Sequence, residues 1–413
     1  MNQDLLAPPS PARAKAGARD AVDDLPGEPL SVVVVHTADE LREHLPAWRR
    51  LAEVALEPNV FFDPLMAMPA CELFAADGSV DFVLVYAPNR MYPQGPPVLC
   101  GFFPLERRRV PGLRLRYTRL WRYEHCFLCT HLVRADCARE TLAGFLDWLA
   151  TDPAGSPLVQ LRAISGEGPL HKLFVDLLHA RGNASWTSVR YTRALLRRAV
   201  DAEAYALAGI DRKKRHELRR LEKRLSEQGQ LEHVELAADG DLDAWLDDFI
   251  ELESRGWKGR NASALGCSAA DQTFFRRAAH EAFAQGRLMM MALRLDGRSV
   301  AQKCNFIAGD GGFAFKIAFN EEFSRFSPGA ILEMENIARV HQRPHVAWMD
   351  SCAEPDHPMI NRLWQDRRSI EWTWVATGRR PGDLLVALAP FARWFGQKLS
   401  RRRSATSKST TSS

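Results

Sequence analysis

The sequence has few features that would hold a protein in a membrane or in an oxidising compartment. Its longest apolar run near the C-terminus, from Leu384 to Ala392, has nine residues, whereas a membrane-spanning helix needs about 20. Residues 1–30 lack the continuous apolar stretch of a secretory signal, and we expect a disordered leader there. The eight cysteines are scattered without regular spacing, which indicates reduced thiols. We therefore expect a cytoplasmic protein.

An excess of charge of one sign is also missing. The formal net charge of +4 is too small to imply a polyanion, so no nucleic-acid partner is expected. Basic residues are concentrated from Arg212 to Arg224, in a predicted helix whose leucines Leu218, Leu221 and Leu225 share one face. The usual interpretation is a solvated helix docked by its leucines. The alternative is a guide for an anionic substrate, for CoA phosphates or for acidic lipid.

Hydrophobic periodicity predicts one order of elements twice. It reads strand, two helices, three strands, helix, strand, helix and strand, first over residues 31–197 and again over 231–378. The chain is too long for one core, and the fold class is α+β, a mixed sheet with helices on both sides. The predicted division is a disordered leader at 1–30, a first unit at 31–197, a basic linker helix at 198–230, a second unit at 231–378 and an amphipathic basic tail at 379–413.

The tail combines apolar and aromatic residues with a basic end, in LLVALAPFARWFGQKLSRRR. Such a segment can lie in a lipid interface, which would place the protein peripherally at the inner face of the membrane. The alternative is a helix packed on the second unit, with a frayed basic end.

A helix that opens on Pro-Gly follows the third strand of the second unit, in FNEEFSRFSPGAILEMENIARV. Ser327 is the predicted N-cap, Pro328 takes the first helical position, and Gly329 lets a ligand approach the backbone. A helix N-terminus offers unpaired amides and the positive end of the dipole, which suit phosphate. Alone, the motif is an ordinary helix cap. Its place after a strand meander favours a phosphate site.

These residues, together with ELESRGWKG, LDGRSVAQ, FAFKIAF and WMDSC, resemble the CelD-like acetyltransferases of the GNAT superfamily, which are associated with cellulose and envelope polysaccharide synthesis. The duplicated unit is similar to the FemABX transferases. The resemblance covers roughly residues 31–377 and implies two tandem GNAT-like acyltransferase domains. It implies acetyl-CoA or another acyl-CoA as co-substrate, bound by the second unit alone, because the matching segment CTHLVRADCARETL of the first unit has no glycine. The loop SRFSPGA has fewer glycines than is usual in GNAT enzymes.

The resemblance also implies the cofactor site. The strand before the Pro-Gly helix should splay from the next strand and expose amides around residues 317–319 and 350–352, which would polarise the thioester carbonyl. Alternation predicts Phe313, Phe315, Ile317 and Phe319 on one face of that strand and Ala314, Lys316 and Ala318 on the other. The predicted cofactor-binding residues are Ile317, Phe319, Ser327, Pro328, Gly329 and Ala330.

Acyl transfer to an amine needs a base and a polarised carbonyl. Glu253, at the end of the first helix of the second unit, is the predicted base, with Asp350 as runner-up, and Lys316 is predicted to face the cleft. The alternative for Glu253 is an exposed helical glutamate, and the alternative for Asp350 is a structural carboxylate that caps a loop. The alternative for Lys316 is a lysine at the sheet surface. Trp257 and Lys258 are predicted to line the acceptor or CoA surface, unless they are a core tryptophan and a solvent lysine.

Two further signals are weaker. GNAT enzymes often use a tyrosine to protonate the leaving thiolate, but all six tyrosines lie at or before Tyr205, so the proton would come from water, from Ser351 or Cys352, or from the amine. The motif HCFLCTH suggests zinc, but on a strand Cys126 would point opposite to His125, Cys129 and His131, and no metal is expected.

The prediction is an acyl-CoA-dependent N-acyltransferase, most simply an N-acetyltransferase, that acts on a small-molecule or lipid-linked amine of an envelope polysaccharide or lipid precursor. One alternative is a catalytically silent GNAT-fold binding or assembly factor for polysaccharide biosynthesis. Another is a FemABX-like aminoacyl transferase, which is less favoured because only one arm of the helical hairpin typical of tRNA-dependent enzymes is present.

Overall fold

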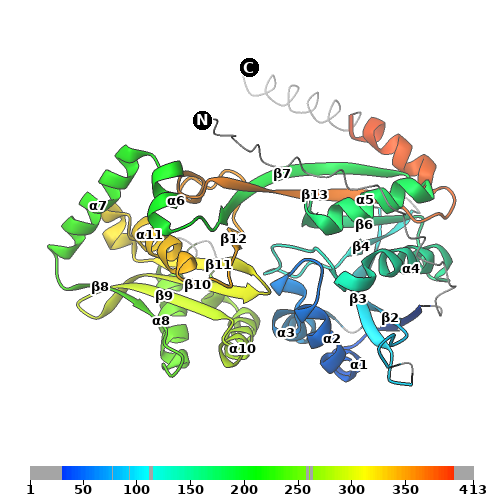
Figure 1. Ribbon diagram of the computed structural model, residues 1–413, viewed down its shortest axis with the longest axis horizontal. Helices are drawn as coiled ribbons and strands as arrows, with labels where there is room; N and C mark the ends of the chain where they lie inside the picture. The colour runs from blue at the N-terminus through cyan, green and yellow to red at the C-terminus, as the bar shows by residue number, and fades with distance from the viewer. Residues whose placement is uncertain are drawn as a thin grey trace, which may run out of the picture.

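The computed structural model describes residues 30–76, 78–92, 94–110, 115–256, 260 and 264–394, and Figure 1 shows two halves side by side. The first half begins with strand β1 and ends with strand β7. Its elements are β1 (Ser31–Val35), α1 (Ala38–Glu43), α2 (Leu45–Glu53), η1 (Val60–Phe62), α3 (Pro64–Phe74), β2 (Val80–Ala87), β3 (Val98–Arg109), β4 (Arg116–Leu120), β5 (Leu132–Val133), η2 (Ala135–Cys137), α4 (Ala138–Thr151), β6 (Leu158–Ser165), α5 (Pro169–Arg181) and β7 (Ser185–Arg197).

The second half follows two connecting helices, α6 (Ala202–Gly209) and α7 (Arg212–Ser226). A last helix over residues 382–394 comes after it. The elements of the second half are β8 (Leu231–Glu235), α8 (Leu242–Arg255), η3 (Leu265–Cys267), α10 (Ala269–Ala284), β9 (Leu288–Leu295), β10 (Arg298–Ala308), β11 (Gly311–Phe319), η4 (Glu321–Phe326), α11 (Pro328–His341), β12 (Trp348–Asp350), α12 (Ile360–Leu363) and β13 (Asp366–Ala376).

The described strands form one 13-stranded sheet, which confirms the α+β class with a mixed sheet. The order is β1-β2-β3-β4-β6-β13-β7-β12-β11-β10-β9-β8, and β5 pairs with β3 beside this path. Read inward from the two edges, the halves have equivalent strands in the same order. From one edge they are β1-β2-β3-β4-β6 and then β13, and from the other they are β8-β9-β10-β11-β12 and then β7. Because β13 lies beside β6 and β7 lies beside β12, the two halves exchange their last strands.

The exchanged strands β7 and β13 form a long antiparallel ribbon that connects both halves (Figure 1). One end of the ribbon joins the second half, where β7 pairs with β12. The other end joins the first half, where β13 pairs with β6 from residue 370 to 376. Neither half therefore has a complete sheet of its own.

The hydrophobic core is continuous between the halves. The rings of Phe61 and Phe313 lie 5.6 Å apart, and those of Phe74 and Phe274 lie 5.4 Å apart. Each pair joins one residue of the first half to one of the second. Aromatic packing of this kind buries a large area at the contact, so the halves are fixed against each other.

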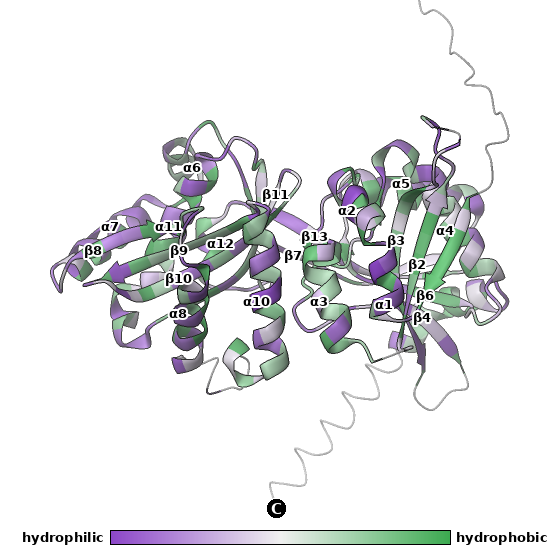
Figure 2. Ribbon diagram, turned by 90° about the horizontal axis from the view of Figure 1, so that it is seen from below, coloured by the Kyte–Doolittle hydropathy of each residue, from purple (hydrophilic) through white to green (hydrophobic). Residues whose placement is uncertain are grey.

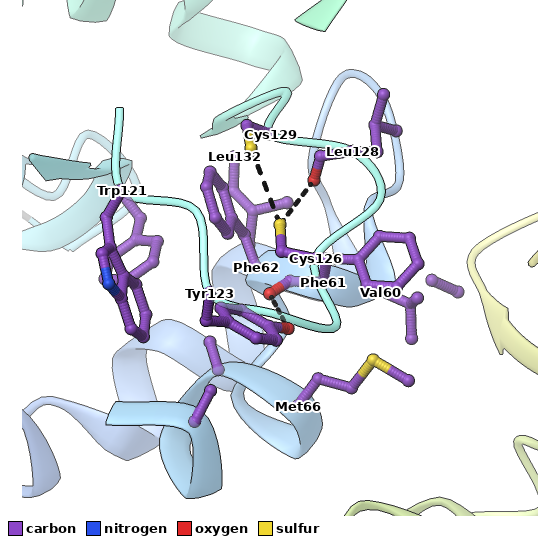
Figure 3. Close-up of a cluster of buried hydrophobic side chains, with 14 of the residues drawn as sticks. Val60, Phe61, Phe62, Met66, Trp121, Tyr123, Cys126, Leu128, Cys129 and Leu132 are labelled. Carbon is purple, nitrogen blue, oxygen red and sulfur yellow. Dashed lines mark hydrogen bonds between the residues drawn. The ribbon is translucent and has the colours of Figure 1, made fainter. Parts of the chain in front are cut away.

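The HCFLCTH segment differs from its expected strand conformation, because it forms a loop after β4. In Figure 3, Cys126 and Cys129 point toward each other, and their Sγ atoms are 3.6 Å apart. The argument that Cys126 points away from Cys129 is therefore wrong. His125 instead contacts Asp271 of the second half, with 2.9 Å between Nε2 and Oδ1.

Helix α7 confirms the interpretation of the basic segment as a docked helix. Its leucines Leu218, Leu221 and Leu225 are buried, while Figure 2 shows the helix in purple over most of its length. Within the described part of the chain, every helix is too short or too polar to span a bilayer.

Candidate functional site

Strand β11 carries a β-bulge where the sequence places its central phenylalanines. Cys304 of β10 pairs with Lys316, and the next residue, Asn305, pairs with Ala314. Phe315 is therefore an extra residue on β11, which shifts the alternation of side chains by one position.

The bulge corrects the predicted faces of β11. Phe313 and Phe315 lie in the core beneath α8 and α10, as two residues of one face should. Ile317 and Phe319 share the opposite face, because their Cδ1 atoms both lie 3.7 Å from the point where a Cβ of Gly329 would be. The prediction that all four share one face is wrong. The shift nevertheless brings Ile317 and Phe319 to the start of α11, among the predicted cofactor residues.

Glu253 and Lys316, predicted separately, meet in the structure. The Nζ atom of Lys316 lies 3.3 Å from Oε1 of Glu253, and the amide of Leu265 donates to Oε2 of Glu253 at 2.8 Å. Glu253 is 2% exposed, so the alternative of an exposed helical glutamate is wrong. Lys316 points to α8 and not to the outer surface of the sheet, because the bulge turns it toward that helix.

The edge of β11 opens beside this ion pair. Strand β12 pairs with β11 only from Gly311 to Phe313, so residues 314–319 have a strand partner on the β10 side alone. The expected splay of the two strands is thus present. On the β12 side the expected free amides are not found, because the amide of Ser351 donates to Ala194 O at 3.1 Å and that of Cys352 donates to Asp350 Oδ1 at 2.9 Å.

The N-terminus of α11 starts at Pro328, as expected. Ser327 precedes the helix in the left-handed conformation, with φ of 54°, and its side chain makes no capping hydrogen bond. The prediction of a side-chain cap at Ser327 is therefore wrong. The carbonyl of Ser327 instead accepts from the amides of Ala330 and Ile331, at 2.9 and 3.1 Å.

Gly329 is buried at this N-terminus. Among the described residues its amide has no acceptor, and buried amides without partners are rare in proteins. The side chains of Ile317, Phe319 and Met359 lie 3.7–3.8 Å from the position that a Cβ at Gly329 would occupy. Arg325 is exposed two residues before Ser327. The Arg325 guanidinium lies over the ring of Phe326, and an unpaired amide at a helix N-terminus with an arginine in the preceding turn fits a phosphate group of CoA.

A buried polar cluster holds α11 on β10. Lys303 Nζ lies 2.8 Å from Glu333 Oε2, and Asn336 and Trp364 donate to Glu333 Oε1 at 2.8 and 2.9 Å. Both members of the ion pair are almost fully buried. Such a cluster fixes one arrangement of helix on strand, because any shift would leave a buried charge without its partner.

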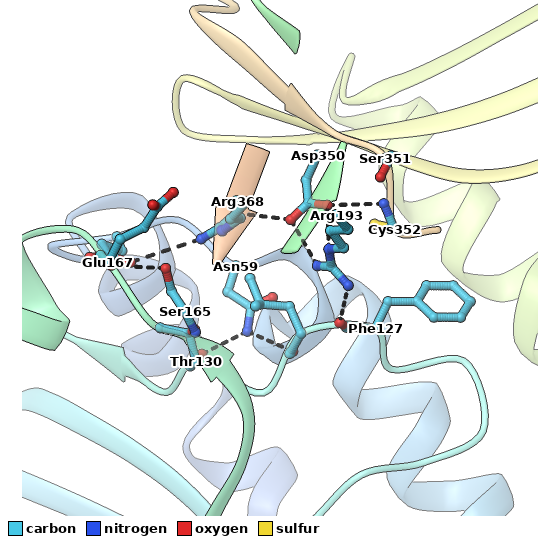
Figure 4. Close-up of polar contacts among 12 residues, drawn as sticks. Asn59, Phe127, Thr130, Ser165, Glu167, Arg193, Asp350, Ser351, Cys352 and Arg368 are labelled. Atoms are coloured by element: carbon cyan, nitrogen blue, oxygen red, sulfur yellow. Dashed lines mark hydrogen bonds and ion pairs between the residues drawn. The ribbon is translucent and has the colours of Figure 1, made fainter. Parts of the chain in front are cut away.

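Asp350 lies between two arginines and not at an open surface (Figure 4). Nε of Arg193 is 2.7 Å from Oδ1, and Nη1 of Arg368 is 3.1 Å from Oδ2. Burial would raise the pKa of Asp350, but the charges of Arg193 and Arg368 outweigh it and hold this pKa below its ordinary value. A carboxylate that two arginines hold ionised, with its pKa lowered, is a poor base, so the geometry favours the structural alternative for Asp350.

Cys352 also has a limited chemical role in this environment. Burial, with the charge of Asp350, raises the pKa of the Cys352 thiol. A thiol with a raised pKa gives up its proton reluctantly, which leaves water, Ser351 or the amine as the proton source for a leaving thiolate. Trp257 and Lys258, predicted to bind substrate, lie outside the described residues.

A groove beside Glu253 is a feature that the sequence did not indicate. It has a volume of about 1150 Å³ and extends from the C-terminal end of α8 to the loop after β11. Arg255 and Arg298 are its two basic residues. No spacing in the sequence joins its acidic residues, because they come from three separate segments. They are Asp248, Glu251, Asp296, Glu321 and Glu322.

Comparisons with known proteins agree with this geometry. Residues 212–357 match the family described as the acetyltransferase (GNAT) domain. No curated protein sequence matches the chain significantly. A conserved protein of unknown function from Bacteroides thetaiotaomicron has a similar fold, with a TM-score of 0.51 and 9% identity over 81% of this chain and 97% of that one.

Two other solved structures align over most of both chains. FemX aligns with a TM-score of 0.49 and 10% identity, over 83% of this chain and 96% of FemX. The C-terminal domain of a putative lysylphosphatidylglycerol synthetase from Agrobacterium fabrum aligns with a TM-score of 0.48 and 11% identity, over 84% and 95% of the two chains. The match over residues 212–357 shows that the second half carries a GNAT acetyltransferase domain, which supports an acyltransferase activity.

Proposed function

We propose that the protein transfers an acyl group, most simply acetyl, from an acyl-CoA to an amine of an envelope polysaccharide or lipid precursor. The observation that carries the proposal is the Glu253–Lys316 pair beside the open edge of β11. A base candidate and a cation stand there next to the strand that leads into α11. The CelD-like resemblance supports the choice of an envelope precursor.

The chemistry assigns one role to each side chain. The nitrogen of a neutral amine attacks the thioester carbonyl carbon, the new C–N bond forms, the C–S bond breaks and CoA leaves as thiolate. Glu253 would accept the proton that the amine loses. The Lys316 ammonium group would stabilise the oxyanion that develops on the carbonyl. The thiolate would take its proton from water.

The cofactor site proposed for the second half is the start of α11. The unpaired Gly329 amide and the exposed Arg325 support a diphosphate at this turn. The apolar side chains of Ile317, Phe319 and Met359 would face the less polar arm of the acyl-CoA.

The groove supports a cationic acceptor. Five carboxylates against two guanidinium groups line it, so its potential favours an ammonium ion over an anion. An amino sugar or a lipid-linked amine carries such a charge before it loses a proton. The groove reaches α8 at Leu252, next to Glu253 in the sequence.

An assay of thiol release tests the proposed function. The protein is incubated with acetyl-CoA or a long-chain acyl-CoA and a panel of amines that includes glucosamine, and free CoA thiol is measured over time. Amine-dependent release of CoA is expected. Binding of acyl-CoA without release by any amine would instead support the catalytically silent assembly factor.

A further inference from the structure

We propose that one face of the protein docks on an anionic lipid bilayer, through the helix over residues 382–394 together with the basic helix α7. This goes beyond the proposed acyl transfer, because it concerns a surface away from Glu253. The partner proposed for this surface is the bilayer itself.

The helix over residues 382–394 exposes an apolar side. Leu384, Leu388 and Phe391 are 60%, 50% and 63% exposed. Their i, i+4, i+7 spacing puts all three on one face. Large apolar side chains on a single stripe of a surface helix indicate a contact that the isolated chain does not provide.

The opposite side of the same helix holds it to the protein. Val386 is buried against Leu158 and Ala376, and the Arg393 guanidinium donates to Ser188 O. The helix thus packs on β6 of the first unit and on β13, the last strand of the predicted second unit, and not on α8 or α11. Since the inner side is already occupied, the exposed leucines cannot turn inward without breaking these contacts.

Positive charge follows the apolar stripe in the sequence and also lies on α7, at the other end of the same edge of the molecule (Figure 1). The sequence after the described helix continues with Lys398 and three arginines at 401–403. Helix α7 exposes further cations on its outer side. They are Arg212, Lys213, Arg219, Arg220, Lys223 and Arg224.

Figure 1 places these elements along one edge of the molecule. Helices α7 and α6 and the helix over residues 382–394 lie along the upper edge, whereas α1 to α3 and the turn between β2 and β3 lie along the lower one. Leu207 of α6 is also exposed, at 60%. Apolar groups that can enter the acyl boundary, flanked by cations that attract acidic headgroups, fit a bilayer surface.

Vesicle flotation of the full chain tests the proposal. Vesicles of phosphatidylcholine are compared with vesicles that also contain phosphatidylglycerol, at low and at high salt. We expect binding to the anionic vesicles only, and loss of binding at high salt because screening weakens the attraction. No binding to either vesicle, or equal binding to both, would overturn the proposal.

Matched variants locate the docking surface. Leu384→Gln/Leu388→Gln/Phe391→Gln should reduce the bound fraction roughly tenfold or more, whereas Met91→Gln/Tyr92→Gln, on the lower edge and also exposed, should not change it. Arg219→Glu/Arg220→Glu should weaken binding, and Arg50→Glu/Arg90→Glu on the lower edge should not. Binding by the triple variant equal to that of the wild type would overturn the proposal. Thiol release without vesicles should be unchanged in every variant, so a failed proposed function would be recognised separately.

Discussion

Glu253 shows how a single residue acquires its role from its surroundings. The carboxylate is buried and bonded to Lys316 and to the amide of Leu265. We predict that Glu253→Gln lowers turnover by about 10²- to 10⁴-fold, the usual contribution of a general base. The affinity for acetyl-CoA should not change, because Glu253 does not contact the start of α11. Thiol release and calorimetric titration measure the two quantities.

A matched variant separates the base from the ion pair. Glu253→Gln leaves the Lys316 charge without its partner, whereas Glu253→Gln/Lys316→Met removes both charges. If an unpaired lysine lowered turnover only by destabilising the fold, the double variant would regain stability but, without both proposed groups, would not regain turnover. We expect it to stay inactive.

The surroundings of His131 lead to a prediction about how stability depends on pH. It is buried against Phe103, and no described group bonds to either ring nitrogen. Burial lowers its pKa from 6.5 to about 3. Below pH 6.5 the unfolded chain therefore binds a proton that the folded protein does not, and stability falls as the pH falls toward 3.

The corresponding measurement is urea unfolding of wild type and His131→Leu at pH 7 and pH 5.5. The wild type should lose roughly 1.3 kcal/mol more than the variant between these values. An equal loss in both proteins would show that His131 does not contribute to acid sensitivity.

At the scale of elements, α11 depends on one buried ion pair. Glu333→Gln would leave the Lys303 charge buried without a counter-charge, and we predict a loss of about 3–5 kcal/mol of stability. Lys303→Met/Glu333→Gln should recover part of that loss, because it removes both charges. Thermal and denaturant unfolding measure the difference. A double variant less stable than the single one would contradict this explanation.

The elements themselves were largely predictable, but their side-chain orientation was not. Periodicity placed the strands, the leucine face of α7 and the start of α11 at Pro328. It failed at β11, since a bulge at Phe315 is a choice of backbone pairing that local sequence does not encode. It also failed at Ser327, whose residue type favours a cap although its backbone is left-handed.

At the scale of the whole molecule, the strand exchange predicts that neither half folds alone. A fragment of residues 30–197 would lack β13 at the edge of β6 and would leave β7 without either partner. We expect this fragment to show no cooperative thermal transition, and co-expression with residues 198–394 to restore one. A fragment that melts cooperatively by itself would contradict the account of one shared sheet.

The exchange of the last strands also explains which features of the fold and the site could not be predicted from the sequence. Two similar orders of elements indicate duplication, but which unit receives each last strand depends on contacts between distant residues. The Arg193–Asp350–Arg368 cluster is a consequence, because its members lie on β7, β12 and β13. The acidic groove likewise gathers residues from separate segments. Glu253 and Lys316, in contrast, were each predicted from the sequence, and only the contact between them was not.

The central claim, a CoA diphosphate on the backbone at the start of α11, is tested most directly by calorimetric titration with acetyl-CoA. The proteins are the wild type, Gly329→Ala and Gly329→Glu. A Cβ at Gly329 meets its neighbours at 3.7–3.8 Å, so the alanine variant should bind as the wild type does. The glutamate places a negative charge at the turn and should weaken binding roughly a hundredfold. Unchanged affinity in Gly329→Glu, or no binding by the wild type, would contradict the claim.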